Sequence, residues 1–230
     1  SPDFSPIEFV DTTKSGQDQY VGFDVTLANY LADEMGLTLE IKPMSFDACQ
    51  AAVQLGSVDM SISGFSWTAE RSENFLLSDY YIAGENETEQ AIITTKANEG
   101  AWTTVESFAG KKIGAQATSL QENLCKETFG DTITLELFKS IDDGILALQT
   151  GKIDAMAVAM GNGESIVAAN PDGLAFTGYT FDVADESKNN VIMLNKASTE
   201  MLEKVNELLG KALEANMYAG WYADAQALAG

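Results

Sequence analysis

The sequence predicts an α/β protein of two similar lobes, each a mostly parallel sheet flanked by helices. Three observations support this prediction: an internal repeat at an offset of 95 residues, the same order of helix, strand, helix, strand in both halves, and two apolar runs of strand length that can carry the chain between the halves. With 230 residues and 45% hydrophobic content, the chain is long enough to bury the cores of two modest lobes.

The repeat joins residues 45–64 (SFDACQAAVQLGSVDMSISG) to residues 140–159 (SIDDGILALQTGKIDAMAVA), which align without a gap. In each copy a serine, Ser45 or Ser140, precedes a helical pattern and can accept hydrogen bonds from its first amides. A glycine, Gly56 or Gly151, can then end the helix, and an apolar run of strand length follows. Each copy is therefore predicted to be one helix followed by one strand.

The same offset holds further upstream. Asp24–Met35 has the pattern of a capped helix that Gly36 ends, and residues 37–41 alternate apolar and polar positions as in a strand. Their counterparts are a helix over 119–129 and a strand over 133–137. Each half thus predicts parallel strands joined by helical crossovers.

One strand of the second half has no equivalent in the first. Residues 111–116 (KKIGAQ) predict a strand before the helix over 119–129, whereas residues 1–23 predict a loop and a hairpin with its turn at 15–18 (SGQD). We expect the matching strand either upstream of Ser1 or replaced by another segment.

The chain is predicted to cross between the lobes twice, at residues 91–96 (AIITTK) and at residues 191–194 (VIML). These two crossings would form a hinge, with residues 1–92 and 193–230 in lobe one and residues 93–192 in lobe two. Apolar residues at helical spacing from Thr199 onward predict a tail helix that packs on the lobes: Met201, Leu202, Val205, Leu208, Leu209 and Leu213.

Composition excludes several classes of function. The net charge of -22 opposes binding to nucleic acid and to anionic membrane surfaces, and no apolar run is long enough to span a membrane. The absence of histidine removes the commonest general base and most transition-metal sites, and no phosphate-binding loop follows a strand. We therefore expect a monomer that is not an enzyme and has no cofactor or metal, with Cys49 and Cys125 as buried free thiols.

The lone arginine, Arg71, is the most informative residue for function. It follows the first-half strand of the repeat, where Ser63, Gly64 and Ser66 lie at the carboxyl end and ligands collect in parallel α/β sheets. Its planar guanidinium can bind a carboxylate through two charge-assisted hydrogen bonds. The alternative is a surface ion pair with a neighbouring glutamate.

Aromatic residues could hold the rest of a ligand. Phe4 and Phe46 can form an apolar and cation–π platform, with core packing as the alternative for both. Core packing is favoured for Phe75 and Phe108. The pair Tyr80-Tyr81 is expected on the lobe surface.

The second half offers the opposite side of the predicted cleft. Thr118 and Ser119 open the helix that follows residues 111–116, and Val158 and Ala159 end the second-half strand of the repeat. Both segments lie at carboxyl ends of predicted strands, so we expect them to face the Arg71 segment.

A family resemblance runs through most of the chain. The motifs that carry it are PDFSP (2–6), GFDV (22–25), FDA (46–48), VD (58–59), SWTAER (66–71), SDYY (78–81), GKKIG (110–114) and LQTGKIDA (148–155). Together they resemble the polar amino-acid-binding proteins of ABC transporters, which have the type II periplasmic-binding-protein fold. The resemblance implies capture of a solute outside the membrane, closure of the lobes around it and delivery to a membrane permease. It also implies a periplasmic or lipid-anchored location, with the signal segment outside this sequence.

The resemblance assigns the carboxylate end of the ligand. It implies that Arg71 holds the α-carboxylate, helped by Ser66 and by the backbone at Gly64 and Ser119. It further implies that Phe4 and Phe46 flank the ligand side chain, while Gln116 and Thr118 select among side chains.

Two positions depart from the family pattern. Ala159 stands where an aspartate usually binds the α-ammonium, and Leu120 stands where a hydroxyl or glycine is common. Because a buried ammonium without a partner is costly, either another acid, with Glu164 nearest, reaches in or the ligand is not an ordinary free α-amino acid. Asn162 could bind a neutral group. A carboxylate with an apolar, N-substituted or amide-bearing body fits these residues better than arginine or lysine.

Two other functions stay open on the sequence alone. The resemblance includes dehydratases of this fold that act on prephenate-like carboxylates, for which Glu164 would be the nearby acid or base. It also includes ligand-sensing domains of receptors.

Overall fold

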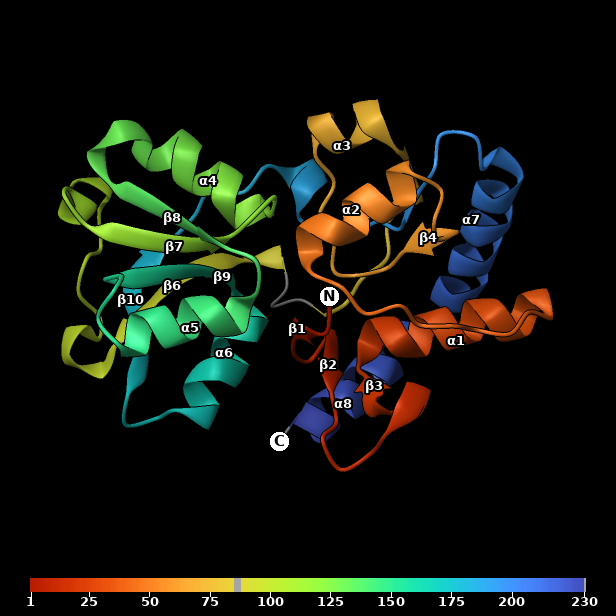
Figure 1. Ribbon diagram of the computed structural model, residues 1–230, viewed down its shortest axis with the longest axis horizontal. Coiled ribbons are helices and arrows are strands. Elements are labelled where there is room, and N and C mark those ends of the chain that lie inside the picture. The colour runs from red at the N-terminus through yellow and green to blue at the C-terminus, as the bar shows by residue number, and fades with distance from the viewer. Residues whose placement is uncertain (85–87, 230) are drawn as a thin grey trace. The chain divides into compact units, whose positions relative to one another are not determined.

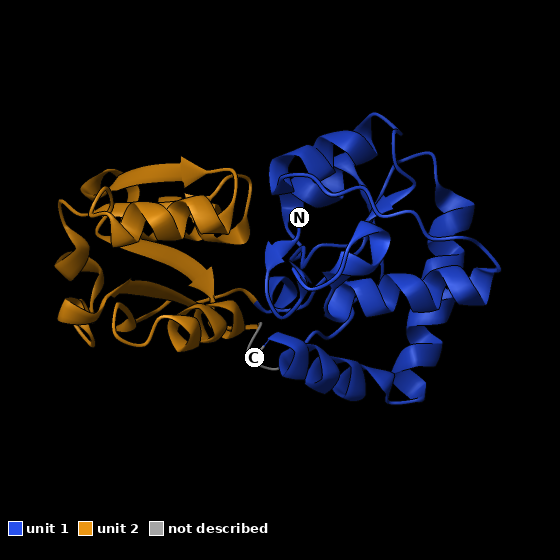
Figure 2. Ribbon diagram, turned by 60° about the horizontal axis from the view of Figure 1, so that its bottom comes forward, with its two compact units in different colours: residues 1–85, 185–230 blue, residues 86–184 orange. Residues whose placement is uncertain are grey.

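The computed structural model describes residues 1–84 and 88–229, and the chain divides into two compact units (Figures 1 and 2). Unit 1 holds residues 1–85 and 185–230, and unit 2 holds residues 86–184. The chain passes from unit 1 to unit 2 after residue 85 and returns after residue 184, whereas the sequence predicts these boundaries after residues 92 and 192. The two predicted crossings are ordinary sheet strands instead: β6 (Gln90–Thr95) has strand partners on both sides within unit 2, and β11 (Met193–Leu194) has them within unit 1.

Unit 2 contains one mixed sheet of five strands. β7 pairs in parallel with β8 and β9, whereas β6 pairs antiparallel with β9 and β10. The order across the sheet is β10 (Leu174–Thr180), β6, β9 (Ala155–Ala159), β7 (Lys112–Gln116), β8 (Thr134–Phe138).

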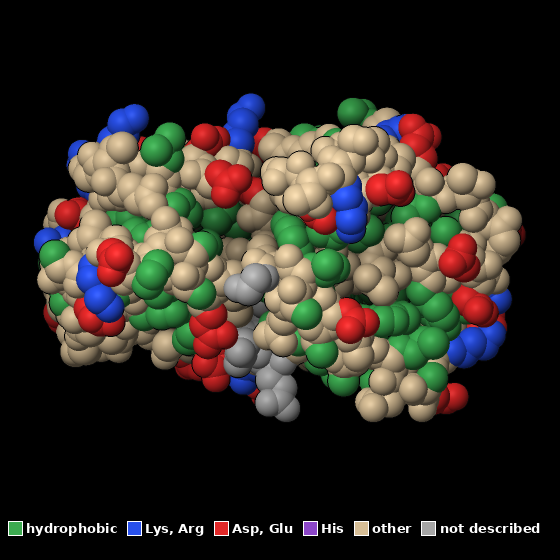
Figure 3. Space-filling view, turned by 90° about the horizontal axis from the view of Figure 1, so that it is seen from below, with side chains coloured by type: hydrophobic (Ala, Val, Ile, Leu, Met, Phe, Trp, Pro, Cys, Tyr) green, Lys and Arg blue, Asp and Glu red, His purple; other side chains and the backbone are tan. Residues whose placement is uncertain are grey.

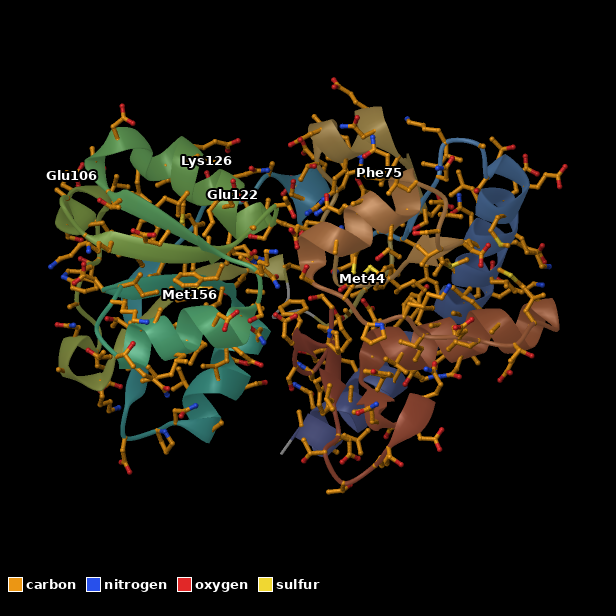
Figure 4. The ribbon with its side chains drawn as sticks, viewed as in Figure 1. Met44, Phe75, Glu106, Glu122, Lys126 and Met156 are labelled. Carbon is orange, nitrogen blue, oxygen red and sulfur yellow. The ribbon has the colours of Figure 1, made fainter. Side chains whose placement is uncertain are left out.

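Three helices cover this sheet, with α4 (Leu120–Phe129) on one face and α5 (Ile141–Gln149) and α6 (Met160–Ala169) on the other (Figure 1). Strand β9 shows why both faces need cover, because all five of its residues are apolar and buried. Successive side chains of a strand point to opposite faces. Ala155 and Ala157 accordingly pack in the α4 cluster, and Met156 and Val158 in the α5 cluster, where Figure 4 labels Met156.

Unit 1 contains two antiparallel sheets of three strands, so the prediction of a mostly parallel sheet is wrong for this unit. The first has the order β1 (Asp3–Phe4), β2 (Glu8–Val10), β3 (Tyr20–Val21), and the second the order β4 (Met60–Ser61), β11, β5 (Leu76–Leu77). The helices around them are α1 (Phe23–Met35), α2 (Phe46–Gln54), α3 (Ala69–Asn74), α7 (Thr199–Glu214) and α8 (Met217–Ala229).

Local signals in the sequence place many of these elements. The helix α1 ends at Gly36, whose φ of 67° lies in the left-handed region that glycine adopts without strain. The short 3-10 turn η1 (Gly16–Gln19) joins β2 to β3 where the hairpin turn was expected. The thiols of Cys49 and Cys125 are free and buried, as predicted. Further 3-10 turns in the described part of the chain include η3 (Lys96–Asn98), η4 (Val105–Phe108), η5 (Gly130–Thr132) and η6 (Asp185–Ser187).

The tail forms the two helices α7 and α8. Val205, Leu208 and Leu209 of α7 are buried in the main core of unit 1, as their helical spacing predicts. Leu213, one turn further on, is 55% exposed, so the apolar stripe stops packing before the helix ends.

The repeat is confirmed as helix followed by strand: α2 and β4 correspond to α5 and β9. Of the two serine caps, Ser140 accepts a hydrogen bond from the backbone N–H of Asp143 at 3.1 Å, whereas Ser45 makes no side-chain cap hydrogen bond. The repeat therefore predicts where the helices and strands lie, but not whether a serine side chain caps each helix.

The predicted strand over 37–41 does not form. Its counterpart β8 pairs with β7, but within the described residues unit 1 has no counterpart of β7, and β4 lies at the edge of its sheet. Without a neighbouring strand, residues 37–41 adopt no regular structure and Leu37 is 56% exposed. The backbone of Ile41 bonds instead to the side chain of Gln17, with N to Oε1 at 2.6 Å.

Across residues 1–84 and 88–229, none of the helices combines the length and the apolar character needed to cross a membrane. Figure 3 shows acidic side chains spread over the visible face among neutral and apolar ones. This distribution agrees with the strongly negative net charge.

Residues 37–41 and their counterpart β8 should differ in the rate at which their backbone amides exchange hydrogen. We expect the amides of residues 38–40 to exchange rapidly, because they lie outside any sheet, and those of β8 to exchange much more slowly. Exchange measured by mass spectrometry on peptides covering 37–42 and 132–138 checks this expectation. Equal protection of the two peptides would show that residues 37–42 are paired in solution.

Candidate functional site

The guanidinium of Arg71 is buried in unit 1, at 4% exposure. The helix α3 positions it, because the Thr68 hydroxyl caps this helix by accepting a hydrogen bond from the Arg71 backbone N–H at 3.2 Å. Nη1 of Arg71 donates to the Ser66 carbonyl oxygen at 2.6 Å. Burial lowers the pKa of Arg71 to about 10, so the group stays cationic at neutral pH. The alternative of a surface ion pair is therefore wrong.

Two aromatic rings support the buried cation. The guanidinium carbon lies 5.6 Å from the centroid of Phe46 and 5.2 Å from that of Phe65, and the two rings stack at 4.5 Å. Phe46 is buried in a core cluster of unit 1. The cation that lies over its ring is the guanidinium of Arg71. Phe75 and Phe108 are buried core residues, as predicted. Sequence analysis missed Phe65, although it lies between Gly64 and Ser66.

Phe4 lies against the bare backbone of Gly64. A Cβ built on Gly64 would stand 2.6 Å from Cε1 of Phe4, and the φ of Gly64 is +55°. Only glycine therefore meets both the conformation and the space at this position. The ring of Phe4 is partly buried against the core of unit 1.

A buried acid network lies beneath the same turn. The Ser63 hydroxyl donates to Oε1 of Glu8 at 2.5 Å, and the Gly64 backbone N–H donates to Oδ2 of Asp24 at 2.7 Å. The Tyr81 hydroxyl donates to the same Asp24 oxygen at 3.0 Å. Tyr81 is fully buried, so its predicted place on the lobe surface is wrong, whereas Tyr80 is exposed as expected.

Burial dominates the electrostatics of this network. It raises the pKa of Asp24 to about 6, against the opposing effect of the hydrogen bond from Gly64. Burial, followed by repulsion from Asp24, also holds the pKa of Glu8 well above its ordinary value. Burial and the neighbouring charges of the two acids likewise raise the pKa of Tyr81. Burial thus shifts all three groups toward their neutral forms, although Asp24, with a pKa of about 6, is still largely ionised at pH 7.

Asn190 links the two chain segments that carry these residues. It forms isolated antiparallel bridges with both Ser66 and Tyr81, and its backbone N–H and C=O exchange hydrogen bonds with Tyr81 at 3.3 and 3.0 Å. Sequence analysis missed this buried residue, which precedes the apolar run 191–194.

The predicted residues of unit 2 gather where β7 meets α4. Ser119 is the N-cap of α4, and its Oγ accepts from the Glu122 backbone N–H at 3.1 Å. Thr118 takes a φ of 64°, and its N–H donates to Oε2 of Glu122 at 2.6 Å. Glu122 also pairs with Lys126 one turn further along α4 (Figure 4). Gln116 and Leu120 are both buried at this end of the strand and helix.

Ala159 is the last residue of β9 and the N-cap residue of α6. It is buried opposite Gln90 of β6. Glu164, the acid considered as a substitute for the usual aspartate, is exposed further along α6. Asn162 in the first turn of α6 is buried. Of the two polar residues considered for this end of β9, Asn162 is thus buried and Glu164 is exposed.

In unit 2 the predicted residues lie at the ends of the neighbouring parallel strands β7 and β9. In unit 1 they come from several elements, with Phe4 on β1, Phe46 at the start of α2 and Arg71 in α3. Comparison with known proteins defines the class. The family model of bacterial extracellular solute-binding proteins, family 3, matches residues 1–224, and the chain belongs to this family.

Individual relatives agree with this membership. The arginine-binding extracellular protein ArtP of Bacillus subtilis is 30% identical over 218 residues, which cover 94% of this chain and 79% of the relative. A probable histidine-binding protein of Campylobacter jejuni is 26% identical, covering 87% and 77%. Among solved structures, the amino acid ABC transporter substrate-binding protein AbpA of Streptococcus pneumoniae, bound to L-arginine, has a TM-score of 0.89 and 32% identity, covering 100% of this chain and 93% of the neighbour. The chain is thus a solute-binding protein and not an enzyme.

A matched pair of glycine substitutions tests the packing of the turn. Gly64→Ala should lower the free energy of unfolding by at least about 1 to 3 kcal/mol, because alanine is strained at positive φ and its Cβ would collide with Phe4. Gly210→Ala, in the helix α7 with open space around it, should raise stability by about 0.5 to 1 kcal/mol. Urea unfolding of both variants gives the measurement, and a neutral Gly64→Ala would contradict the described contact.

Proposed function

We propose that this solute-binding protein captures a small amino acid outside the cell and delivers it to the membrane permease of an ABC transporter. The observation that carries the proposal is the buried guanidinium of Arg71, the chain's only arginine, which bonds to the Ser66 carbonyl in the segment that follows β4. A buried cation is an effective partner for a carboxylate, because charge-assisted hydrogen bonds strengthen away from water. The family supports a transport role.

The α-carboxylate is assigned to Arg71, Ser66 and Ser119, so that the ligand contacts residues of both units. Ser63 and Gly64 take a different part in the proposal. Their hydroxyl and amide hydrogens already go to buried acids in unit 1, so these residues shape the turn instead of donating to the ligand. Ligand contact with both units would favour a closed arrangement of the protein over an open one.

The side-chain end of the ligand is assigned to Phe4, Phe46, Gln116 and Thr118. Phe4 has the freer ring of the two aromatics, because Phe46 already stacks on Phe65 and lies under Arg71. The described residues Leu120 and Ala159 add apolar surface. Periplasmic or lipid-anchored attachment belongs to the same proposal.

Two ligand classes follow from different observations. The two relatives and the structural neighbour bind or are named for arginine or histidine, which favours a cationic amino acid. Ala159 in place of an aspartate favours a ligand whose amine is substituted or absent. In the proposal, buried Asn162 in the first turn of α6 is the group that meets the amine, and exposed Glu164 is not assigned a ligand contact.

A thermal-shift screen separates these classes. The expected result is a rise in melting temperature with L-arginine or a related amino acid at millimolar concentration, because a ligand that binds only the folded state stabilises it by mass action. Arginine, histidine, glutamine, N-acetylated amino acids and simple dicarboxylates form the panel. A response to arginine would show that Ala159 does not exclude cationic ligands, and silence across the whole panel would contradict the amino-acid proposal.

Substitution of Arg71 tests the carboxylate assignment. Arg71→Lys keeps the charge but loses the planar fork, and Arg71→Ala loses both, so we expect affinity for the screened ligand to fall at least tenfold and at least a hundredfold, about 1.4 and 2.7 kcal/mol. Lys14→Ala removes an exposed cation as the matched control. Titration calorimetry measures binding, and circular dichroism confirms folding. If folded Arg71→Ala bound within threefold of the parent, the assignment would be wrong.

A further inference from the structure

Glu8 and Asp24 form a buried pair of acids directly beneath the Ser63–Gly64 turn. Glu8 lies on β2 and Asp24 in the first turn of α1, and their exposures are 4% and 1%. The turn follows β4, so three separate elements of unit 1 meet at this pair. Neither acid has a role in the ligand contacts assigned above.

The hydrogen bonds of the pair leave one oxygen on each acid. Oε1 of Glu8 accepts from Ser63, and Oδ2 of Asp24 accepts from both Gly64 and Tyr81. The remaining oxygens, Glu8 Oε2 and Asp24 Oδ1, are buried and have no hydrogen-bond partner as two ionised carboxylates. A buried polar atom in that state costs free energy.

A single proton resolves this imbalance. The side chain of Asp24 is within hydrogen-bond reach of Glu8. Ionised carboxylates only accept hydrogen bonds, so a bond between the two acids requires that one of them carry a proton and donate it. Two ionised carboxylates at this spacing would also repel each other in a medium of low dielectric constant. The protonated pair satisfies both oxygens and removes the repulsion.

We propose that Glu8 and Asp24 share one proton and act as positioning residues that hold the Ser63–Gly64 turn, which links ligand binding to pH. The link to binding rests on the proposed function, whereas the shared proton does not. Loss of the proton would place two anions that repel each other under the turn. As the two carboxylates move apart, the Ser63 hydroxyl and the Gly64 amide that are bonded to them would be displaced. The ligand-facing atoms of the turn would then lose their fixed positions.

The other charged groups around the pair act in both directions. The amino group of Ser1, 3.0 Å from Oγ of Ser63, favours ionisation of both acids. Asp3 opposes ionisation of Glu8. Tyr81 donates to Asp24 and so favours its ionised form. Burial outweighs these contributions for both acids.

The sign of the pH dependence follows from the raised pKa of each acid. Folding keeps a proton that the unfolded chain releases near its ordinary pKa of about 4. The stabilising effect is therefore complete below that pH and is lost as pH rises through the raised pKa values of the pair, which for Asp24 is about 6. The chain contains no histidine, so few other side chains titrate between pH 5.5 and 8.5.

The experiment compares the parent protein with Glu8→Gln and Asp24→Asn. Each amide can donate permanently to the remaining acid and still accept from the turn, so it imitates the protonated pair. We expect the melting temperature of the parent to fall by several degrees from pH 5.5 to 8.5 and that of the variants to change much less. Glu34→Gln, which removes an exposed charge from the same helix α1, should keep the slope of the parent.

Two further measurements separate positioning from simple stability. Infrared difference spectra of parent minus Glu8→Gln at pH 7 should contain the carbonyl band of a protonated carboxylic acid. Calorimetry with L-arginine, or with the ligand found in the screen, should show affinity of the parent falling at least threefold between pH 6 and 8.5, with Glu8→Gln nearly flat. Glu8→Ala, which leaves Ser63 without its acceptor, should bind more weakly at every pH.

The outcomes distinguish this inference from the proposed function. If no amino acid binds but the pH slope of melting disappears in Glu8→Gln or Asp24→Asn, the shared proton stands and the proposed function fails. If a ligand binds through Arg71 but parent and both amide variants show the same slopes and no acid band, the shared proton is refuted.

Discussion

Burial of charge at the end of β4 is the constraint on which the rest of unit 1 depends. The segment that follows this strand runs over an acid pair at Gly64 and reaches a buried guanidinium at Arg71. Water cannot solvate either charge, so the protein must supply partners from several elements. The rings of Phe46 and Phe65 and the carbonyl of Ser66 serve the cation. The same short stretch thus needs contributions from β2, α1, α2 and the bridge at Asn190.

The internal repeat made much of the fold predictable. Capping serines, terminal glycines and apolar periodicity are local signals, and they located α1, α2, α4, α5, β8 and β9. Residues 37–41 carry an equally good strand pattern and yet form no strand. A strand is stable only beside another strand, and this condition cannot be deduced from the segment itself. The apolar runs 91–96 and 191–194 were misread for a related reason, because an apolar strand inside a sheet and one between units have the same pattern.

The candidate site was predictable in part. Arg71 was found because it is unique in the chain and follows the repeated strand, and its burial gives that inference a physical basis. Tyr81 was misplaced because a tyrosine beside an exposed tyrosine gives no local sign of burial. Glu8 and Asp24 were missed because an acidic residue is ordinarily exposed to solvent, and nothing in the local sequence marks these two as exceptions. Only the tertiary contacts with Ser63 and Gly64 reveal that both acids are enclosed.

The net negative charge of the protein affects the binding of both the amine and the carboxylate of the proposed ligand. A net charge of -22 attracts cations and repels carboxylates at long range. A carboxylate therefore needs a strong local partner, and desolvated Arg71 provides one where solvent screening is weakest. The same negative field makes ionisation of a second buried acid beside Asp24 less favourable, which favours retention of a proton by the pair. With that proton in place, the pair keeps one negative charge beneath the turn instead of two. The turn can then present polar atoms to a zwitterionic ligand with less buried negative charge below it.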